Sequence, residues 1–372
     1  MNIFWFRRDL RLHDNTALNA ALKKGSVQPI FIFDSNILSK LSQDDSRLTF
    51  IHSVLGSINN ILNKHNVSIM CYCGDPLEMW KKIIKDFNIQ NVYWNKDYEP
   101  YAIRRDQSVI EFLNSKNLNV NTFKDQVIFE EGEVVKTNGD PYTVFTPYKN
   151  KWLANFEKKH GSSLFPISSK LDFTKFNNLK STFPSLKSIG FNRSNIQVRD
   201  FCFEKLENYH TTRDFPSSDE TSYLGPHLRF GTISIRECVN IALANNIIFL
   251  SELIWREFFM QILFHFPYVE NKCFKLKYEA VKWRNNKQEF QCWSSGMTGF
   301  PLVDAGIRQL NQTGYMHNRV RMVVASFLVK HLLIDWRWGQ DFFAKKLLDF
   351  ELSSNNGNWQ WAAGTGCDSA PY

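Results

Sequence analysis

The sequence lacks the cysteine pattern of a disulfide-stabilised or zinc-binding protein. Its seven cysteines are scattered, their number is odd, and no two of them form a CxxC pair. This pattern argues against a disulfide framework and against a structural zinc site. We therefore expect buried, reduced thiols in a cytosolic protein that binds no metal.

Long apolar runs and the common catalytic motifs are also missing. No stretch approaches the roughly 18 apolar residues of a membrane span. Arg7 and Arg8 follow the apolar start, which is the wrong order for a signal peptide. GxGxxG, GxSxG and HExxH do not occur, and the nine histidines are scattered. These absences exclude the usual dinucleotide fingerprint, the nucleophile elbow and the zinc-protease signature.

Aromatic residues, by contrast, are abundant. The 372 residues include 32 Phe, 12 Tyr and 11 Trp, which together make up 15% of the chain. They indicate either an aromatic-packed core or a site that stacks flat rings or carries electrons. The net charge of +8 favours a basic face that attracts a polyanion such as nucleic acid.

Residues 1–130 predict an α/β domain with a doubly wound parallel sheet, because strands alternate with helices. The predicted strands are Ile3–Phe6, Pro29–Phe33, Val67–Tyr72 and Val92–Asn95, and the predicted helices are Asn15–Lys24, Leu48–His65, Leu77–Phe87 and Ala102–Asn117. Sheets of this kind bind ligands at the carboxyl ends of their strands.

Residues 131–200 change in character, and residues 201–372 are mainly helical. The first segment is rich in Lys, Asn, Ser and Phe and carries four spread prolines, which predicts a long connection. Helical periodicity follows at Leu250–Phe266, Pro301–Gln312 and His317–Trp336. The predicted fold is therefore α/β plus all-α, with a linker between the two domains.

Charged residues interrupt the apolar helix predicted at Leu250–Phe266. Glu252, Trp255 and Arg256 share one face with Phe259. An exposed Glu–Arg pair is the ordinary interpretation, but a helix that is apolar all round is expected to be buried. Buried charges need partners or a function, and we favour a function here.

Two further segments carry polar groups on apolar backgrounds. In His317–Trp336, Asn318 and Arg321 at the amino end indicate either a lined cavity or an ordinary helix entering the core. In Asp349–Gly366, tryptophans lie among asparagines and glycines, which predicts a site for a flat polar heterocycle. Hydroxyls and glycines in Thr221–Ile235 are consistent with a phosphate cradle or an ordinary turn.

Six long sequence motifs are spread over nearly the whole chain. They are Phe4–Asn15, Pro141–Trp152, Glu252–Phe259, Thr298–Leu310, Thr313–Trp336 and Asn355–Tyr372. Together they resemble the DNA photolyase/cryptochrome family, and in particular cyclobutane pyrimidine dimer photolyases of the class I-like bacterial type. The resemblance implies light-driven repair of pyrimidine dimers in DNA by electron transfer from excited reduced FAD.

The resemblance also implies which residues hold a U-shaped FAD. Contacts to its phosphates and ribitol are implied for Tyr209, Thr221, Ser222, Leu224 and Gly225. The ring system would be surrounded by Arg256, Asn318, Arg321, Asp349, Glu351 and Asn355, with Arg321 paired to Asp349 and Asn355 facing flavin N5. The family usually has Asp at the position of Glu351 and often Ser at the position of Gly225.

Catalytic and DNA-binding residues follow from the same resemblance. Three tryptophans match an electron-transfer chain that runs outward from the flavin through Trp359, Trp336 and Trp283. The dimer pocket is matched by Glu252, Trp255, Asn318, Met322 and Trp361, while DNA phosphates would be held by Arg213 and Arg319. The dimer would flip into this pocket, a behaviour for which photolyases are a standard example. There Glu252 would stabilise the dimer radical anion.

Other functions stay open at this point. A cryptochrome-like blue-light photoreceptor would share the FAD pocket but not the dimer pocket, and it usually has Asp or Cys where this chain has Asn355. A photolyase for the (6-4) photoproduct typically has Gln at the position of Glu252. The family usually continues for on the order of several tens of residues beyond Tyr372, so we also expect a shortened or fragmentary chain whose FAD retention needs testing.

An antenna chromophore is expected to be possible but stays unidentified. Folate-binding members have an Asn–Glu pair after the Tyr-Glu of the fourth strand's loop, whereas Pro100 follows Tyr98 and Glu99 here. We expect FAD as the cofactor and DNA containing pyrimidine dimers as the partner. We further expect no membrane and no metal, a monomer, and a cytoplasmic, nucleoid-associated location.

Overall fold

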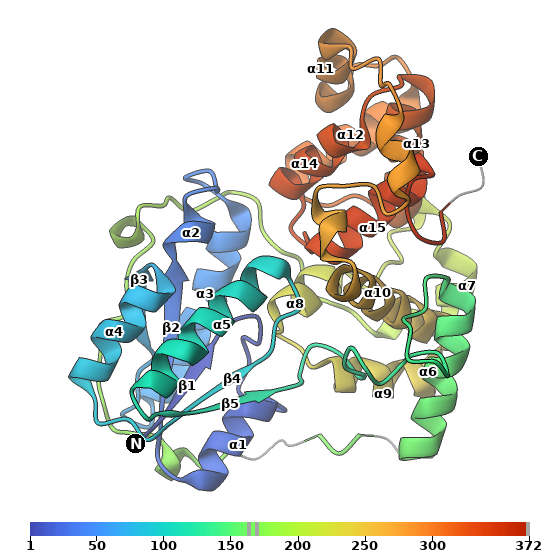
Figure 1. Cartoon of the computed structure of the whole chain (residues 1–372). Helices are drawn as coiled ribbons and strands as arrows, with labels where there is room; N and C mark the ends of the chain where they lie inside the picture. Colours follow the sequence, from blue (N-terminus) through green and yellow to red (C-terminus); the bar gives the residue numbers. More distant parts are fainter. Residues whose placement is uncertain (162–164, 168–170, 370–372) are drawn as a thin grey trace. The chain divides into compact units, whose positions relative to one another are not determined.

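The computed structural model describes residues 1–161, 165–167 and 171–369, which divide into two compact units (Figure 1). The sheet unit comprises Met1–Ile128, Phe165–Gln197 and His227–Cys238. The helical unit comprises Phe129–Leu164, Val198–Pro226 and Val239–Tyr372. Both units therefore draw on segments that lie far apart in the sequence.

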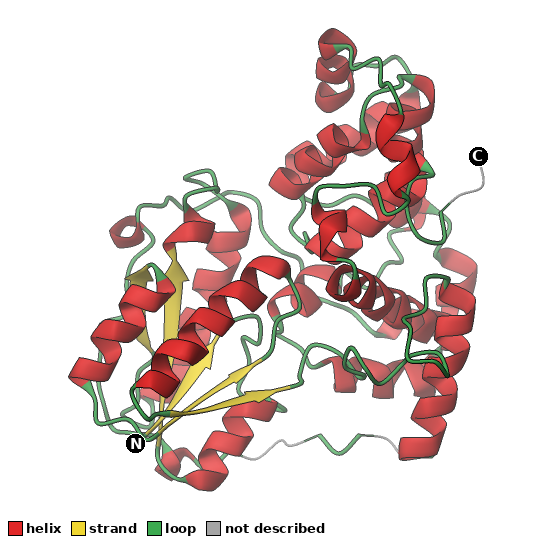
Figure 2. Cartoon of the chain, in the orientation of Figure 1, coloured by secondary structure: helices red, strands yellow, loops and turns green. Residues whose placement is uncertain are grey.

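The sheet unit contains a five-stranded parallel sheet with the order β3-β2-β1-β4-β5 (Figure 2). Its strands are β1 Asn2–Phe6, β2 Val27–Asp34, β3 Met70–Gly74, β4 Asn91–Asn95 and β5 Asn119–Phe123. The helices between and after them are α1 Thr16–Lys24, α2 Ser35–Leu38, α3 Ser46–Asn63, α4 Pro76–Asp86 and α5 Pro100–Ser115. The predicted fold class is confirmed.

Both faces of this sheet are buried, as parallel sheets require. Phe4 and Phe6 of β1 pack into a core with Leu18 of α1, while Ile3 and Trp5 point into a second core with Trp80 of α4 and other residues. Side chains alternate between the faces of a strand, so one continuous apolar run supplies both cores.

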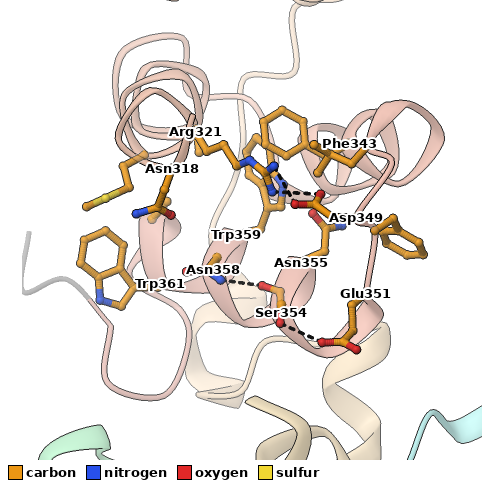
Figure 3. A pocket seen from close by; sticks show the side chains of 15 residues that line it. Asn318, Arg321, Phe343, Asp349, Glu351, Ser354, Asn355, Asn358, Trp359 and Trp361 are labelled. Carbon is orange, nitrogen blue, oxygen red and sulfur yellow. Dashed lines mark hydrogen bonds and ion pairs between the residues drawn. The ribbon is translucent and has the colours of Figure 1, made fainter. Parts of the chain in front are cut away.

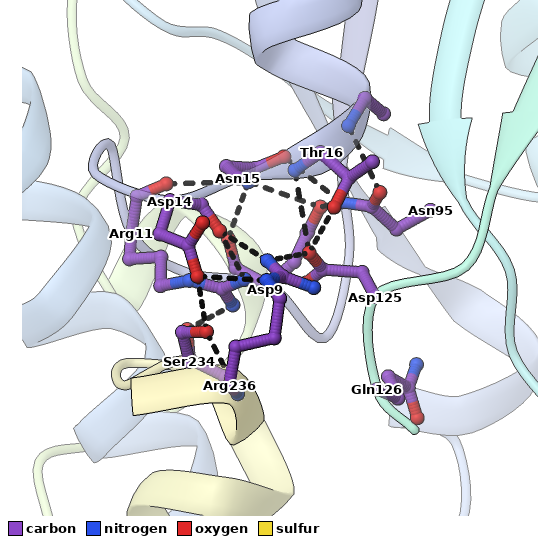
Figure 4. Close-up of polar contacts among 12 residues, drawn as sticks. Asp9, Arg11, Asp14, Asn15, Thr16, Asn95, Asp125, Gln126, Ser234 and Arg236 are labelled. Atoms are coloured by element: carbon purple, nitrogen blue, oxygen red, sulfur yellow. Dashed lines mark hydrogen bonds and ion pairs between the residues drawn. The ribbon is translucent and has the colours of Figure 1, made fainter. Parts of the chain in front are cut away.

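A buried polar cluster lies where β1, β4 and β5 end (Figure 4). Asp125, which follows β5, accepts hydrogen bonds from Arg11 at 2.6 Å, Arg236 at 2.9 Å and the Thr16 hydroxyl at 2.9 Å. Burial raises the pKa of Asp125, but the two guanidinium groups more than offset this, and its pKa lies below the ordinary value. The cluster ties the segment that contains Arg236 to the strand ends.

The helical unit is built from longer helices and short turns. Its longer helices are α6 Phe145–His160, α10 Ile247–His265, α11 Lys287–Ser295, α12 Pro301–Thr313, α13 Asn318–Ser326, α14 Trp336–Lys346 and α15 Leu352–Ala363, and a shorter one is α7 Tyr209–Thr212. Helices α8 Gly225–Phe230 and α9 Ile235–Asn245 each have residues in both units. Its short 3-10 segments are Glu204–Asn208, Pro216–Ser218, Pro267–Glu270 and Leu276–Ala280, whereas Phe173–Lys175 and Lys187–Ile189 belong to the sheet unit.

Helix α10 is buried on most of its surface, as its apolar composition predicts. Within the part of the chain that the structure describes, none of the helices is long and apolar enough to cross a membrane. Helix α6 lies inside the segment interpreted from the sequence as a connection. Its buried Phe145, Tyr148, Trp152 and Phe156 recur every three or four residues, the spacing of one helix face.

The helix predicted over His317–Trp336 is wrong as a single element. Helix α13 ends at Ser326, a π-helical turn follows at Phe327–His331, and α14 begins at Trp336. The break has a local cause, because Leu333 has a positive φ of 54° and the Asp335 carboxylate accepts a hydrogen bond from the Arg337 N–H as a helix cap. Hydrophobic periodicity does not report such a break.

Candidate functional site

One pocket of the helical unit gathers most of the residues predicted around a ring system (Figure 3). Its empty space of about 620 Å³ includes space that is open to solvent. The predicted residues that line it are Asn318, Arg321, Met322, Asp349, Glu351, Asn355, Trp359 and Trp361. Other lining residues, including Phe343, Ser354 and Asn358, had no signal in the sequence reasoning.

An arginine and an aspartate form the charged centre of this pocket. Arg321 Nη1 donates to Asp349 Oδ1 at 3.2 Å and Nη2 donates to Oδ2 at 2.9 Å, while Arg321 Nε donates to the Met316 carbonyl at 2.8 Å. The two-pronged contact fixes the plane of the guanidinium. A Cβ atom on Gly225 would lie 2.7 Å from Asp349 Oδ2, so glycine allows the carboxylate to approach the start of α8.

Asn355 is held by its neighbour Gln340, which sequence reasoning missed. The Asn355 side-chain amide donates to the Gln340 carbonyl at 3.1 Å, and Asn356 donates to Gln340 Oε1 at 2.8 Å. Because the NH₂ end of Asn355 is engaged, its oxygen is the end left to accept from a ligand. The bond from Asn355 uses the main-chain carbonyl of Gln340, so the residue type at position 340 gives no signal of this support.

A second ion pair joins α10 to the pocket. Arg256 Nη2 lies 3.1 Å from Glu351 Oε1, and the Ser354 hydroxyl donates to Glu351 Oε2 at 3.3 Å. Glu351 is buried, and its contact to Arg256 partners the buried charge. The predicted residues Arg256 and Glu351 thus lie together at one edge of the site.

Of the residues predicted to touch phosphates and ribitol, Thr221 and Gly225 lie near the same centre. The hydroxyls of Thr221 and Tyr315 are 2.9 Å apart, and Tyr315 lies within the electrostatic reach of Arg321 and Asp349. The Ser222 carbonyl accepts from the Cys202 N–H, and Leu224 is buried just before Gly225. Tyr209 packs on Phe249 with ring centroids 5.2 Å apart. No distance places these groups on a ligand, so their roles stay predictions.

Acidic residues bind the two arginines predicted to hold DNA. Arg213 Nη1 donates to Glu252 Oε1 at 2.7 Å, and Arg319 Nε donates to Asp214 Oδ1 at 2.7 Å. The same Asp214 oxygen lies 3.6 Å from Arg213 Nε. Burial lowers the pKa of Arg213, but attraction to Glu252 more than offsets it and leaves that pKa above its ordinary value. Sequence reasoning missed Asp214.

The predicted wedge residues lie on different elements. Trp255 of α10 stacks on Phe145 of α6 with ring centroids 3.6 Å apart and planes 9° from parallel. Trp361 of α15 lines the pocket together with Asn318 and Met322. Trp361 and Asn318 lie on the side away from Asp349 and Glu351 (Figure 3). A second, more apolar hollow shares Met322 and Trp361 and continues past residues such as Phe300 and Val323.

The three predicted electron-transfer tryptophans belong to one aromatic core. Trp336 and Trp359 are buried, and Trp283 is a half-buried residue at the edge of the same cluster. Trp359 lines the pocket, and its ring centroid lies 5.0 Å from that of Phe343. Among the described residues its Nε1 has no hydrogen-bond partner, which leaves a buried donor beside the pocket.

These groups suit a flat, polar, negatively charged ligand. The pocket offers an oriented guanidinium, an amide oxygen, a buried indole N–H and apolar walls, and the glycine at its edge leaves room for close packing. In residues 1–161, 165–167 and 171–369, no three His, Cys, Asp or Glu side chains gather in a group that could hold a metal ion. A parallel α/β unit joined in one chain to a helical unit with such a pocket defines a class of proteins that bind a flat, anionic cofactor.

Comparison with known proteins gives the family. Residues 2–166 match the family described as DNA photolyase, and residues 249–372 match the FAD binding domain of DNA photolyase. A deoxyribodipyrimidine photo-lyase of Vibrio cholerae is 36% identical over 400 residues, which span 100% of this chain and 85% of the relative. The protein of that name from Escherichia coli is 34% identical, with 100% and 83% covered. The chain belongs to the DNA photolyase family.

Solved structures agree with this assignment. A bacterial class III photolyase from Agrobacterium tumefaciens has a TM-score of 0.86 at 33% identity, covering 100% of this chain and 81% of that one. An archaeal photolyase from Sulfolobus tokodaii, solved with two FAD molecules, has a TM-score of 0.83 at 31% identity, covering 100% and 85%. A Synechocystis cryptochrome has a TM-score of 0.81 at 26% identity, covering 100% and 83%.

Proposed function

We propose that this chain is a deoxyribodipyrimidine photo-lyase that binds FAD in the pocket around Arg321 and repairs cyclobutane pyrimidine dimers in DNA under blue light. The observation that carries the proposal is a single pocket whose two sides carry different kinds of side chains. The Arg321–Asp349 pair and Asn355 lie on one side, and Asn318 and Trp361 lie on the other. A flavin ring and a pyrimidine dimer have the matching chemistry.

The residues around the pocket hold the ring system by charge and shape. Arg321 supplies positive charge beside the ring edge, and Asp349 fixes the plane of its guanidinium. Asn355 presents an oxygen that accepts a hydrogen bond from a ring N–H and carries no charge or acidic proton. The chemistry that FAD supplies when bound is the transfer of one electron to the dimer and its recovery after the cyclobutane ring has opened.

DNA binding places the dimer against Asn318, Met322 and Trp361. Arg213 and Arg319 bind the flanking phosphates, after giving up contacts to Glu252 and Asp214. Glu252, released from Arg213, then hydrogen-bonds the dimer as negative charge develops on it. We propose a cytoplasmic, nucleoid-associated monomer that needs no metal.

Replacement of Glu252 tests this function directly. We expect Glu252→Ala to lower the yield of light-dependent repair about 10- to 100-fold, because one preorganised group is lost from the site where charge develops. Glu252→Gln keeps a hydrogen-bond donor and is expected to retain a large part of the repair. Repair is followed as the recovery of absorbance of an oligothymidine dimer, in blue light and in darkness.

The control for this experiment is Glu157→Ala, which removes an exposed carboxylate from α6. FAD binding is measured for every variant before light is applied. A wild-type protein that binds FAD but repairs nothing would contradict the photo-lyase function and favour a photoreceptor. An equal yield of repair by Glu252→Ala and the wild type would show that Glu252 has no role in the mechanism.

Asp214 is expected to oppose DNA binding. Its carboxylate contacts both arginines that bind phosphate. The hydrogen bond from Arg319 lowers the pKa of Asp214, burial opposes this, and the charges of Arg319 and Arg213 lower it further, so the pKa lies below its ordinary value. The carboxylate is therefore ionised at neutral pH and competes with phosphate. We expect Asp214→Asn to raise affinity for damaged and undamaged DNA alike, by about 3- to 10-fold at low salt, with a steeper salt dependence.

Fluorescence anisotropy of labelled oligonucleotides at several salt concentrations measures this effect. Asp341→Asn makes the same change of charge at an exposed position of α14 and serves as the matched control. An equal gain in DNA affinity in both variants would show that the effect comes from net charge and not from the contacts of Asp214. No gain in Asp214→Asn would show that its contacts to Arg213 and Arg319 do not compete with DNA.

A further inference from the structure

Two consecutive asparagines of α15 contact a single residue of α14. The Asn355 amide donates to the main-chain carbonyl of Gln340 at 3.1 Å, and the Asn356 amide donates to Gln340 Oε1 at 2.8 Å. All three side chains are buried. The helices approach closely here because position 339 is a glycine, and a Cβ atom on Gly339 would lie 2.1 Å from Cη2 of Trp359. The main chain and the side chain of Gln340 therefore both hold α15.

The second asparagine, Asn356, has a partner at each polar atom of its side chain. Its Nδ2 also donates to the Val269 carbonyl at 2.8 Å, and its Oδ1 accepts from Gln360 Nε2 at 3.1 Å. Gln360 Nε2 lies 3.2 Å from the carbonyls of Val269 and Lys272. The Gln360 Oε1 accepts from the Phe274 N–H at 2.7 Å. Asn356 can therefore turn only by breaking several buried hydrogen bonds, which is costly.

The orientation of Asn355 decides what this residue offers to the pocket. An asparagine amide has two orientations, which exchange its oxygen and its NH₂ group. In the other orientation the Asn355 oxygen would face the Gln340 carbonyl oxygen, and two acceptors in contact repel each other. With the NH₂ group on that carbonyl, Asn355 Oδ1 has no partner among the residues that the structure describes, and Asn355 lines the pocket. An acceptor there favours a ring nitrogen that bears a proton over one that bears a lone pair.

We propose that Gln340 and Asn356 are positioning residues that keep the oxygen of Asn355 directed at bound FAD and thereby favour the reduced form of the cofactor. The inference rests on the proposed function, in which Asn355 accepts a hydrogen bond from a ring N–H. Reduction of a flavin adds the proton that this contact needs. Neither Gln340 nor Asn356 is among the described residues that line the pocket, so both act through Asn355.

Equilibration of the FAD-loaded protein with a redox dye, in the absence of oxygen, tests this role. At a fixed dye potential, absorbance gives the ratio of reduced to oxidised FAD. Gln340→Met keeps the length of the side chain and removes the acceptor of Asn356, so we expect the ratio to fall about 3- to 10-fold, as for one misplaced hydrogen bond. Gln340→Glu keeps an acceptor oxygen and should retain most of the ratio. Asn356→Leu removes the same contact from the other side and should give a similar fall.

A double-variant cycle separates positioning from a loss of packing. In Asn355→Ala, the further change Gln340→Met should leave the ratio unchanged, because a positioning residue acts only through the residue that it orients. Gln261→Met is the matched control, since it removes another buried amide of the helical unit, which donates to the Phe129 carbonyl at 3.3 Å. We expect Gln340→Met and Gln261→Met both to lower the temperature of thermal unfolding, but only Gln340→Met to lower the ratio.

The outcomes distinguish this inference from the function on which it rests. An unchanged ratio in Gln340→Met and Asn356→Leu, or an equal fall in Gln261→Met, would overturn the positioning role. A fall that persists in the Asn355→Ala background would overturn it as well, because the effect would then not pass through Asn355. FAD binding with a ratio that Asn355→Ala leaves unchanged would contradict the contact between Asn355 and the ring, and with it the positioning role. A wild-type protein that binds no FAD would contradict the proposed function itself.

Discussion

Replacing Arg321 with alanine is expected to weaken FAD binding about 100-fold, which corresponds to about 2.7 kcal/mol. Arg321 and Asp349 are mostly buried, with 24% and 19% of their side chains exposed. Removing one partner of a desolvated pair typically costs about 2–5 kcal/mol, and the partial exposure here places the expected loss near the lower end. The remaining Asp349 carboxylate would also repel an anionic ligand.

Titration of the FAD-free protein with FAD, followed by quenching of flavin fluorescence, measures this change. Arg321→Lys keeps the charge but loses the two-pronged contact to Asp349, so an intermediate loss of about tenfold is expected. Arg284→Ala removes an exposed arginine that is paired with Glu289, and it should leave FAD binding unchanged. An unchanged affinity for FAD in Arg321→Ala would show that the flavin binds at another site.

The sheet unit was largely predictable because its signal is local. Apolar runs bounded by turn residues indicated β1, β2 and β4 to within a few residues of their observed ends. For β3, the buried Val67 and Ile69 lie just before the hydrogen-bonded ladder, so the apolar run begins earlier than the strand. Edge strand β5 was not predicted, because its sequence NVNTF is half polar and only partly buried.

The site was predictable only in part, because its members meet through long-range contacts. The segment motifs named several residues of α13 and α15 that line the pocket, because a helical spacing brings such neighbours together, but they did not name Ser354 or Asn358. Nothing local indicates that Gln340 orients Asn355, or that Asp214 binds Arg319 across 105 positions of sequence. Partners of this kind are set by packing between elements, which periodicity does not encode.

The contacts of helix α6 were also not predictable from local sequence, because its main polar contact is to Glu257. This residue of α10 is 3% exposed, and its Oε1 accepts from Trp152 Nε1 at 2.7 Å, the Tyr148 hydroxyl at 3.3 Å and the Phe129 N–H at 3.2 Å. Burial, followed by the charge of Glu257, raises the pKa of Tyr148 well above its ordinary value, so the phenol stays a donor. The Glu257 carboxylate thus connects α10 both to α6 and to the main chain at Phe129.

Glu257→Ala is therefore expected to destabilise the helical unit by about 3–5 kcal/mol, since each buried donor left without an acceptor costs about 1–3 kcal/mol and the losses are not fully additive. Glu257→Gln retains an acceptor oxygen without the charge and is expected to lose about 1–2 kcal/mol. Urea unfolding of the FAD-free protein, monitored by tryptophan fluorescence, measures both, with the exposed Glu157→Ala as control. A loss below about 1 kcal/mol in Glu257→Ala would mean that water replaces the carboxylate at these donors. In that case α6 would be held by its aromatic face alone, and Phe145 would still stack on Trp255.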